Sequence, residues 1–348
     1  MRTYTIDVIA GDGIGKEVAP AAVACIDAVA ARHDFRIGWR DRDWGSDRYL
    51  AEGAMMPADG IEQLRDGDGV FLGAVGHPDI DDAVTLWGLL IPIRRAFELY
   101  LNIRPIRLLP GVQPRVTRNA DIDVVVVREN VEGEYSEVGG RAFDGTPEAM
   151  AFQQALFTRR GIARVADYAA GLAASRTGKL ISATKSNGII HSMPFWDEVV
   201  AETVAAHPGV ELESVLIDAL SARMVLAPSS VDVIVASNLF GDILSDLAAA
   251  VAGSIGIAPS ANVNPDRSVP SMFEPVHGTA PDIVGKGIAN PVGALWAGAM
   301  MLDHLGEAEG ARTLTAAFEG ALADGVSTPD LGGSASTTEF VDEVLRRI

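Results

Sequence analysis

The sequence is poor in cysteine. Cys25 is the only one in 348 residues, so no disulfide can form within the chain, and this usage is typical of a reducing compartment. No signal-peptide pattern precedes the first glycine-rich turn in MRTYTIDVIAGDG. A cytoplasmic location is therefore expected.

Positive charge is also scarce, with a formal net charge of −19. Nucleic acids and anionic membranes bind proteins through basic surfaces, so neither is expected as a partner. A local basic pocket would still be compatible with a small anionic substrate. The longest weakly polar run, LAAAVAGSIGIAPSA from Leu247, is too short to cross a bilayer.

What is present is the composition of a folded globular protein, with 48% apolar and 22% charged residues. Short β-branched runs such as YTIDVIA, GVFLGAV and IDVVVVREN alternate with Ala-rich amphipathic stretches such as KEVAPAAVACIDAVAARH. This alternation predicts an α/β fold with largely parallel strands. Two Pro- and Gly-rich stretches, LPGVQPRVTRNAD and IAPSANVNPDRSVPS, predict loops or crossovers, and the region from NPVGALW to the end predicts consecutive helices.

Two aspartates, Asp242 and Asp246, are four residues apart in SNLFGDILSDL, which follows the apolar run VDVIVA. On a helix that spacing puts both carboxylates on one face, where like charges repel. Acids near a helix N-terminus also favour the helix dipole, which explains one aspartate but not the pair. Together with Asp218 in VLIDALSARM, the pair makes a hard divalent cation a plausible ligand.

Several other stretches carry residues suited to chemistry. The turn in AGDGIGKEV joins an expected strand to an expected helix, and FEPVHGTAPDIVGKGIANP predicts a long ordered loop of the kind that often binds ligands. The guanidinium groups of Arg94, Arg104 and Arg128 could bind carboxylates, or could only solvate the surface. Tyr135 could donate a proton or pack in the core, and Lys185 could be a base or an ordinary solvated lysine.

Five motifs, in their order along the chain, resemble those of the metal-dependent β-decarboxylating dehydrogenases, the isocitrate/isopropylmalate dehydrogenase family. The motifs are GDGIGKEV, RENVEGEY, ATKSNG, SNLFGDILSDL and EPVHGTAPDIVGKGIANP. The resemblance covers roughly the whole chain, and TLWGLLIPIRRAFELYLNIRP is most similar to the tartrate and D-malate branch. It implies a two-domain isopropylmalate dehydrogenase-like α/β fold with a mixed, largely parallel sheet core, not a Rossmann fold. Residues 1–99 with 253–348 would bind the cofactor, and residues 100–252 would provide the substrate, metal and dimerisation domain.

The resemblance also implies roles for individual residues. Arg94, Arg104 and Arg128 would bind the substrate carboxylates, Tyr135 would protonate the enol and Lys185 would be the base. Asp218, Asp242 and Asp246 would hold Mg²⁺ or Mn²⁺, with Lys185 and Asp218 serving the site of a second copy in a homodimer. The cofactor would be NAD, bound by Ile14, His277, Gly278, Ala280, Asp282 and Asn290; the Asp282 carboxylate would accept from the ribose hydroxyls and repel the 2′-phosphate of NADP.

The implied reaction is oxidative decarboxylation of a small 2-hydroxy dicarboxylic acid. The stretch TLWGLLIPI offers only Thr85 as a hydrogen-bonding side chain and no basic residue for a third carboxylate, which argues against isocitrate as the substrate. If Trp87 narrows the pocket, D-malate or tartrate fits, whereas Leu89 and Leu90 are compatible with 3-isopropylmalate. One alternative is therefore 3-isopropylmalate dehydrogenase. An alternative of another class is a catalytically silent regulatory subunit of the same family.

Overall fold

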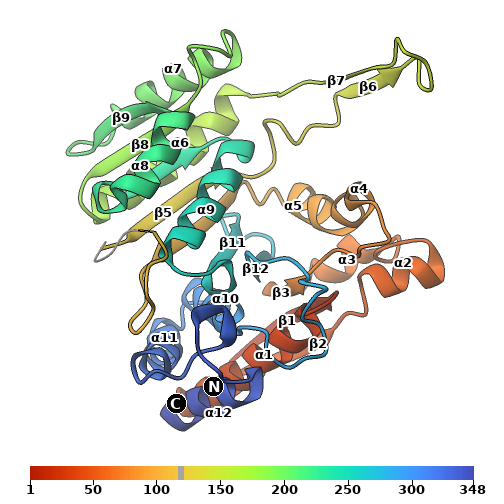
Figure 1. Cartoon of the computed structure of the whole chain (residues 1–348), viewed down its shortest axis with the longest axis vertical. Coiled ribbons are helices and arrows are strands. Elements are labelled where there is room, and N and C mark those ends of the chain that lie inside the picture. Colours follow the sequence, from red (N-terminus) through yellow and green to blue (C-terminus); the bar gives the residue numbers. More distant parts are fainter. Residues whose placement is uncertain (117–120) are drawn as a thin grey trace. The chain divides into compact units, whose positions relative to one another are not determined.

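The computed structural model describes residues 1–116 and 121–348 (Figure 1). It divides into two compact units, which are described separately. Unit 1 comprises Met1–Leu99, Pro105–Asn119 and Ala249–Ile348, and unit 2 comprises Tyr100–Arg104 and Ala120–Ala248. Residues 105–116 and 249–252 thus fall in unit 1, whereas the sequence analysis placed all of 100–252 in one domain. The functions assigned to the two domains stay predictions.

Unit 1 contains five neighbouring sheet strands in the order β2-β1-β3-β12-β11. The adjacent strands are parallel, except that β11 runs antiparallel to β12. The strands are β1 (Arg2–Gly11), β2 (Phe35–Asp41), β3 (Gly69–Ala74), β11 (Pro259–Val263) and β12 (Ser271–Pro275). These strands confirm the largely parallel arrangement predicted from the alternating pattern and the mixed sheet that the resemblance implied.

Most helices of unit 1 belong to the N-terminal and C-terminal segments of the chain. They are α1 (Gly15–Arg32), α2 (Ser46–Glu52), α3 (Gly60–Leu64), α4 (Asp82–Thr85), the π-helical turn η1 (Leu86–Leu90), α5 (Ile91–Ala96), α10 (Val292–His304), α11 (Ala308–Ala323) and α12 (Thr337–Arg347), with 3₁₀ turns η3 (Ile255–Ile257) and η4 (Pro329–Leu331). Helix α1 packs against α10, α11 and α12 (Figure 1). The expected consecutive C-terminal helices are confirmed.

Unit 2 holds strands in the order β4-β5-β10-β8-β9, in which β5, β10, β8 and β9 pair in parallel. The strands are β4 (Leu101–Arg107), β5 (Asp123–Glu129), β8 (Lys179–Thr184), β9 (Glu211–Leu216) and β10 (Val233–Ala236). The helices are α6 (Arg159–Ser175), α7 (Ser192–Val204), α8 (Ile217–Leu226), the 3₁₀ turn η2 (Pro228–Ser230) and α9 (Asn238–Ala252), and β4 and α9 each cross the division between the units.

A separate two-stranded hairpin, β6 (Gly139–Ala142) with β7 (Met150–Gln153), projects from unit 2 (Figure 1). Its large apolar side chains are exposed: Phe143 is 64%, Phe152 59% and Met150 57% accessible. An isolated two-stranded hairpin is marginal in water, and exposed apolar clusters commonly mark interaction surfaces.

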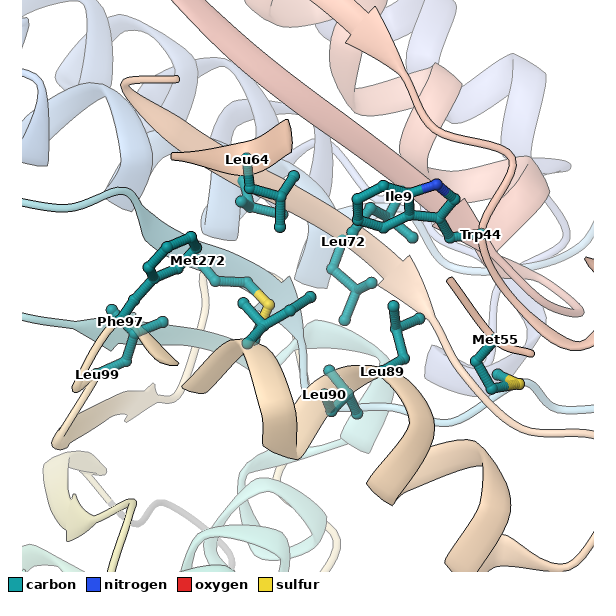
Figure 2. Close-up of a cluster of buried hydrophobic side chains, with 12 residues drawn as sticks. Ile9, Trp44, Met55, Leu64, Leu72, Leu89, Leu90, Phe97, Leu99 and Met272 are labelled. Carbon is teal, nitrogen blue, oxygen red and sulfur yellow. The ribbon is translucent and has the colours of Figure 1, made fainter. Parts of the chain in front are cut away.

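A hydrophobic cluster in unit 1 holds η1 and α5 against the sheet (Figure 2). Leu89 of η1 is fully buried and Leu90 is 8% exposed, and both belong to this cluster with Leu72 and Met272. These two leucines are therefore core residues. Gly88 permits the close packing, because a Cβ there would lie 2.7 Å from Cγ of Met55.

The loop prediction for IAPSANVNPDRSVPS is wrong for part of its length. Residues Pro259–Val263 form the buried strand β11. Its small polar residues disguised it, but they are satisfied in the interior: Asn262 Nδ2 donates to Met272 O at 3.3 Å and to Glu274 Oε1 at 2.8 Å. The other predicted loop, LPGVQPRVTRNAD, has no helix or strand over 109–116, and its residues 117–120 lie outside the described residues.

The glycine-rich turn between β1 and α1 has the expected strand-to-helix form. Gly11 and Gly13 adopt φ of +69° and +53°, in the left-handed region that favours glycine. A Cβ on Gly13 would lie 2.2 Å from Thr279 O, so this turn packs directly on the HGTAPD segment of unit 1. Within the described residues, no helix is long and apolar enough to span a membrane.

Candidate functional site

Helix α9 carries the aspartate pair, as the spacing predicted. In unit 2 the side chains of Asp242 and Asp246 meet the guanidinium of Arg104, whose Nη1 lies 3.2 Å from Asp242 Oδ1 and 3.3 Å from Asp246 Oδ1. Burial raises the pKa of Asp246, the Arg104 charge opposes that shift, and the Asp242 charge adds to it. Two neighbouring carboxylates therefore share cationic partners, which relieves the repulsion that the sequence implies.

Arg128 is the second cation of this cluster. It lies at the end of β5, is 3% exposed, and donates from Nη1 to Asp242 Oδ1. The Asn238 side-chain oxygen accepts from Arg128 Nε at 3.1 Å and from Nη2 at 2.6 Å. Gly241 makes room for the arginine stem, because a Cβ there would lie 2.7 Å from both Cβ and Cγ of Arg128. The guanidinium is thus held in one orientation.

Arg104 is held in a similar way on β4. Its Nε donates to Asn102 Oδ1 at 2.8 Å and its Nη1 donates to Ser245 Oγ at 2.7 Å. Both partners are buried. These amide and hydroxyl groups fix the orientation of a buried guanidinium whose charge faces the carboxylates of Asp242 and Asp246.

Tyr135 completes the cluster from the loop that follows β5. Its hydroxyl donates to Asp242 Oδ2 at 3.1 Å, and the Arg128 guanidinium lies 5.6 Å from its ring centroid. Tyr135 is therefore not a core residue. The cluster of Arg104, Arg128, Tyr135, Asp242 and Asp246, named here the arginine–aspartate cluster, contains five of the residues selected from the sequence.

Lys185 and Asp218 form a separate pair in unit 2. Lys185 Nζ donates to Asp218 Oδ1 at 2.7 Å, and this contact lowers the pKa of Asp218. Lys185 follows β8 and Asp218 begins α8. The Asp218 side chain is 66% exposed, so its carboxylate is open to solvent.

The remaining arginine, Arg94, lies in unit 1 at the end of α5. Its Nη2 donates to Glu274 Oε1 at 2.8 Å, and Asn262 also donates to that oxygen. The structure thus places Arg94 with Glu274, whereas Arg104 and Arg128 share the cluster in unit 2. In the same unit, Thr85 is buried with its hydroxyl donating to Asp82 O at 3.2 Å, and the Arg95 guanidinium lies over the Trp87 ring at 4.7 Å.

The segment 276–291 is free of helix and strand, as expected for an ordered loop. Ile14 N donates to Thr279 O at 3.0 Å, so the first turn and this loop meet. His277 is buried, which lowers its pKa and keeps the imidazole neutral; its Nε2 has no hydrogen-bond partner among the described residues. Gly278 faces open space, Ala280 has φ of +42°, and Asp282 is exposed.

Asn290 is used inside the protein. Its Nδ2 donates to Asp330 Oδ2 at 3.0 Å, and its Oδ1 accepts from Val292 N at 3.0 Å at the start of α10. The side chain therefore fixes the end of the loop, while its expected contact with a cofactor stays a prediction.

The donor sets can be compared with the groups they are expected to hold. Asp242 and Asp246 offer the hard oxygen ligands that Mg²⁺ and Mn²⁺ prefer. Over residues 1–116 and 121–348, no three His, Cys, Asp or Glu side chains come together to hold a metal ion. The residues therefore fit a metal if a third carboxylate is supplied from another chain. For a nucleotide, the unpartnered His277 Nε2 and the open space at Gly278 fit.

Comparison with known proteins decides the family. The model of the isocitrate/isopropylmalate dehydrogenase family matches residues 5–344. The chain belongs to the isocitrate/isopropylmalate dehydrogenase family. It is 49% identical to the D-malate dehydrogenase [decarboxylating] of Escherichia coli strain K12 and to the tartrate dehydrogenase/decarboxylase of Pseudomonas putida, over 100% of this chain and 99% of each relative.

A solved structure of this family confirms the expected fold. The isocitrate dehydrogenase of Methylococcus capsulatus superposes with a TM-score of 0.90 at 33% identity, over 99% of both chains. Dehydrogenases of the family generally use a divalent metal and NAD(P), and they are typically dimeric. The resemblance stated from the motifs is thus confirmed.

Sequence reasoning missed the residues that orient the site. Four of them stood in quoted motifs but received no role: Asn102 in TLWGLLIPIRRAFELYLNIRP, Glu134 in RENVEGEY, and Asn238 and Ser245 in SNLFGDILSDL. Asparagine and serine are common in loops and at helix ends for reasons unrelated to catalysis. Only their contacts with Arg104 and Arg128 distinguish them.

Proposed function

We propose that this protein catalyses the NAD-dependent, metal-dependent oxidative decarboxylation of D-malate or tartrate. The observation that carries the proposal is the arginine–aspartate cluster, in which two oriented guanidinium groups, two carboxylates and a tyrosine hydroxyl converge. The full-length similarity at 49% identity to enzymes named for these two reactions supports the same conclusion.

The residues divide the chemistry as follows. Arg104 and Arg128, with Arg94, bind the substrate carboxylates, and Lys185 accepts the proton of the 2-hydroxyl as the hydrogen on C2 leaves as hydride. The 2-oxo acid formed then loses its β-carboxylate as CO₂, and the electrons of the broken bond form an enolate. The Tyr135 hydroxyl delivers the proton that this enolate takes up on carbon.

Asp242 and Asp246, with Asp218 of a second copy of the chain, are the residues that would hold Mg²⁺ or Mn²⁺. When bound, the divalent ion supplies Lewis-acid stabilisation of negative charge, and NAD accepts the hydride. Ile14, His277, Gly278, Ala280, Asp282 and Asn290 are the proposed nucleotide residues. The exposed Asp282 carboxylate supports NAD over NADP, because it would repel a 2′-phosphate.

The π-helical turn η1 supports a small substrate. The case for 3-isopropylmalate rested on Leu89 and Leu90, but both side chains are buried in the core cluster of unit 1 (Figure 2). Trp87 is only partly buried and is stacked by Arg95. A rigid indole at this position favours hydrogen or hydroxyl at C3 over an isopropyl group.

The homodimer is part of the proposal. The exposed apolar residues of the β6–β7 hairpin and the exposed Asp218 beside Lys185 support an assembly in which a second copy completes each site. The single buried cysteine is consistent with the proposed cytoplasmic location.

The test is NADH formation with Mn²⁺ or Mg²⁺ and D-malate, the tartrates, 3-isopropylmalate or isocitrate in turn. We expect D-malate or a tartrate to give the highest kcat/KM, NADP to be a poor acceptor, and a chelator to abolish turnover. A highest kcat/KM for 3-isopropylmalate would reject the small-substrate assignment. No NADH with any of these acids would favour a catalytically silent subunit.

A further inference from the structure

The loop that carries Tyr135 is fastened to the N-terminus of α9 by one carboxylate. This loop, residues 130–138 between β5 and β6, is named here the tyrosine loop. Glu134 Oε1 accepts from Ser237 Oγ at 2.9 Å, and Glu134 Oε2 accepts from the backbone N–H of Leu239 at 3.2 Å. Leu239 lies in the first turn of α9, where a negative charge is favoured by the helix dipole.

A second contact joins the same two segments. Asn238 Nδ2 donates to Glu132 O at 3.3 Å while its oxygen holds Arg128. Gly133 has φ of +80°, and a Cβ there would lie 3.4 Å from Asn238 Cβ, so the tyrosine loop sits close on the helix. The tyrosine loop is therefore held at one position along α9.

The position of the tyrosine loop along α9 determines where the Tyr135 hydroxyl lies. Tyr135 follows Glu134 directly, and its hydroxyl donates to Asp242 Oδ2 at 3.1 Å, one helical turn beyond the N–H that Glu134 accepts. A proton donor acts efficiently only when it is held within hydrogen-bond reach of the atom it serves. We propose that Glu134, with Ser237, is a positioning residue for the Tyr135 hydroxyl, so that loss of the Glu134 contacts selectively slows proton transfer to carbon.

The tyrosine loop contains its own matched control. Glu132 also makes two accepted hydrogen bonds, from Thr158 N at 2.8 Å and from Thr158 Oγ1 at 2.7 Å, but these fasten the loop to the start of α6. Glu132 and Glu134 are both half-buried. Removing either carboxylate removes two hydrogen bonds, but of these two carboxylates only that of Glu134 binds the helix that carries Asp242. The contact of Glu132 with α9 uses its backbone oxygen, which the Glu132→Ala variant keeps.

The inference rests on the proposed function, and its test separates the two. The full-length wild type, Glu134→Ala, Glu132→Ala, Glu134→Gln and Ser237→Ala are compared in three measurements. These are the Tm, the kcat and KM for D-malate, and the exchange of pyruvate methyl hydrogens with D₂O in the presence of Mg²⁺, followed by NMR. The exchange reports proton transfer at carbon without hydride transfer.

We expect Glu134→Ala to lower both kcat and the exchange rate by about tenfold or more. A loss of this size is part of the roughly 10²- to 10⁴-fold that a general acid contributes to the rate. KM should change by less than about twofold. Glu132→Ala should lower the Tm to a similar extent and leave the exchange rate within about twofold of wild type. Glu134→Gln should restore most of the exchange, because its amide can donate to Ser237 Oγ and accept from Leu239 N. Ser237→Ala should give an intermediate loss.

Equal loss of exchange in Glu134→Ala and Glu132→Ala would overturn the positioning role, as would an unchanged rate in Glu134→Ala. If Glu134→Ala does not fold, an exchange rate in Ser237→Ala equal to wild type is the overturning result. A wild type that reduces NAD with none of the hydroxy acids would overturn the proposed function and this inference together.

Discussion

At the scale of single residues, the orientation of Arg128 depends on the absence of a side chain at Gly241. The Gly241→Ala substitution adds a methyl group 2.7 Å from Cβ and Cγ of an arginine that is 3% exposed. We expect a loss of about 1–3 kcal/mol in the free energy of unfolding, from overpacking. Because the guanidinium must shift, KM for the dicarboxylate should also rise by about tenfold, measured from initial rates.

Gly171→Ala is the control for that change. Gly171 is an exposed position within α6, and a Cβ there would meet nothing within 4 Å. Alanine is favoured over glycine inside a helix by roughly 0.5–1 kcal/mol, so this variant should be slightly more stable and keep its KM. An equal rise of KM in both variants would show that helix glycines affect activity without involving Arg128.

The buried carboxyl of Glu129, next to Arg128 in the sequence, should make the stability of the protein depend on pH. Burial raises the pKa of Glu129 from its ordinary 4.5 to about 7, although its carboxylate accepts from the backbone N–H groups of Val131 and Glu132. The folded state therefore holds a proton that the unfolded state releases, and this part of the stability is present below pH 4.5 and lost as the pH rises through 7.

The Glu129→Gln variant should lack that loss, because its amide oxygen can accept both backbone bonds without a charge. We expect the stability of the variant relative to wild type to increase between pH 4.5 and 7.5, by up to about 3 kcal/mol. Urea unfolding at the two pH values measures the difference. A difference that does not change with pH would mean that Glu129 ionises in the folded protein as it does in water.

At the scale of elements, the π-helical turn η1 carries both a partly exposed residue, Trp87, and a core residue, Leu89. Trp87 is partly buried under Arg95, whereas Leu89 is fully buried in the core. We expect Trp87→Ala to change the ratio of kcat/KM for D-malate to that for 3-isopropylmalate by about tenfold in favour of 3-isopropylmalate. Leu89→Ala should instead cost about 2–5 kcal/mol of stability and leave the ratio unchanged. A ratio that responds only to Leu89→Ala would contradict this division.

Elements with a strong hydrophobic pattern could be predicted from the sequence. The first helix shows this, since Val18, Ala22, Cys25, Ile26 and Val29 recur at helical spacing and all are fully buried. Strand β11 could not be predicted, because its Ser260 and Asn262 are polar and buried, and only their partners in the folded chain make them tolerable.

The candidate site was predictable in the same uneven way. The spacing of Asp242 and Asp246 on a helix predicts their common face. The arginines and Tyr135 were candidates from the sequence, and the resemblance supplied their roles. The contacts of Glu134 with Ser237 and Leu239 join residues about a hundred positions apart. No local pattern encodes such a contact, so its importance appears only in the folded structure.

At the scale of the whole molecule, the proposal requires that each site combine residues of two chains. Among the described residues, one chain brings Asp242 and Asp246 together, whereas Asp218 pairs with Lys185. A complementation experiment tests this arrangement. Tyr135→Phe and Lys185→Ala should each be nearly inactive as homodimers, for lack of the proton donor and of the base.

Co-expression of the two variants with different affinity tags yields a hybrid that can be isolated. If Lys185 serves the partner's site, one site of the hybrid has an intact Tyr135 and an intact Lys185, while the other lacks both. The hybrid should then recover about half of the wild-type kcat per dimer. If both residues instead serve the site of their own chain, one site of the hybrid lacks Tyr135 and the other lacks Lys185. Neither site is then complete, and the hybrid stays inactive.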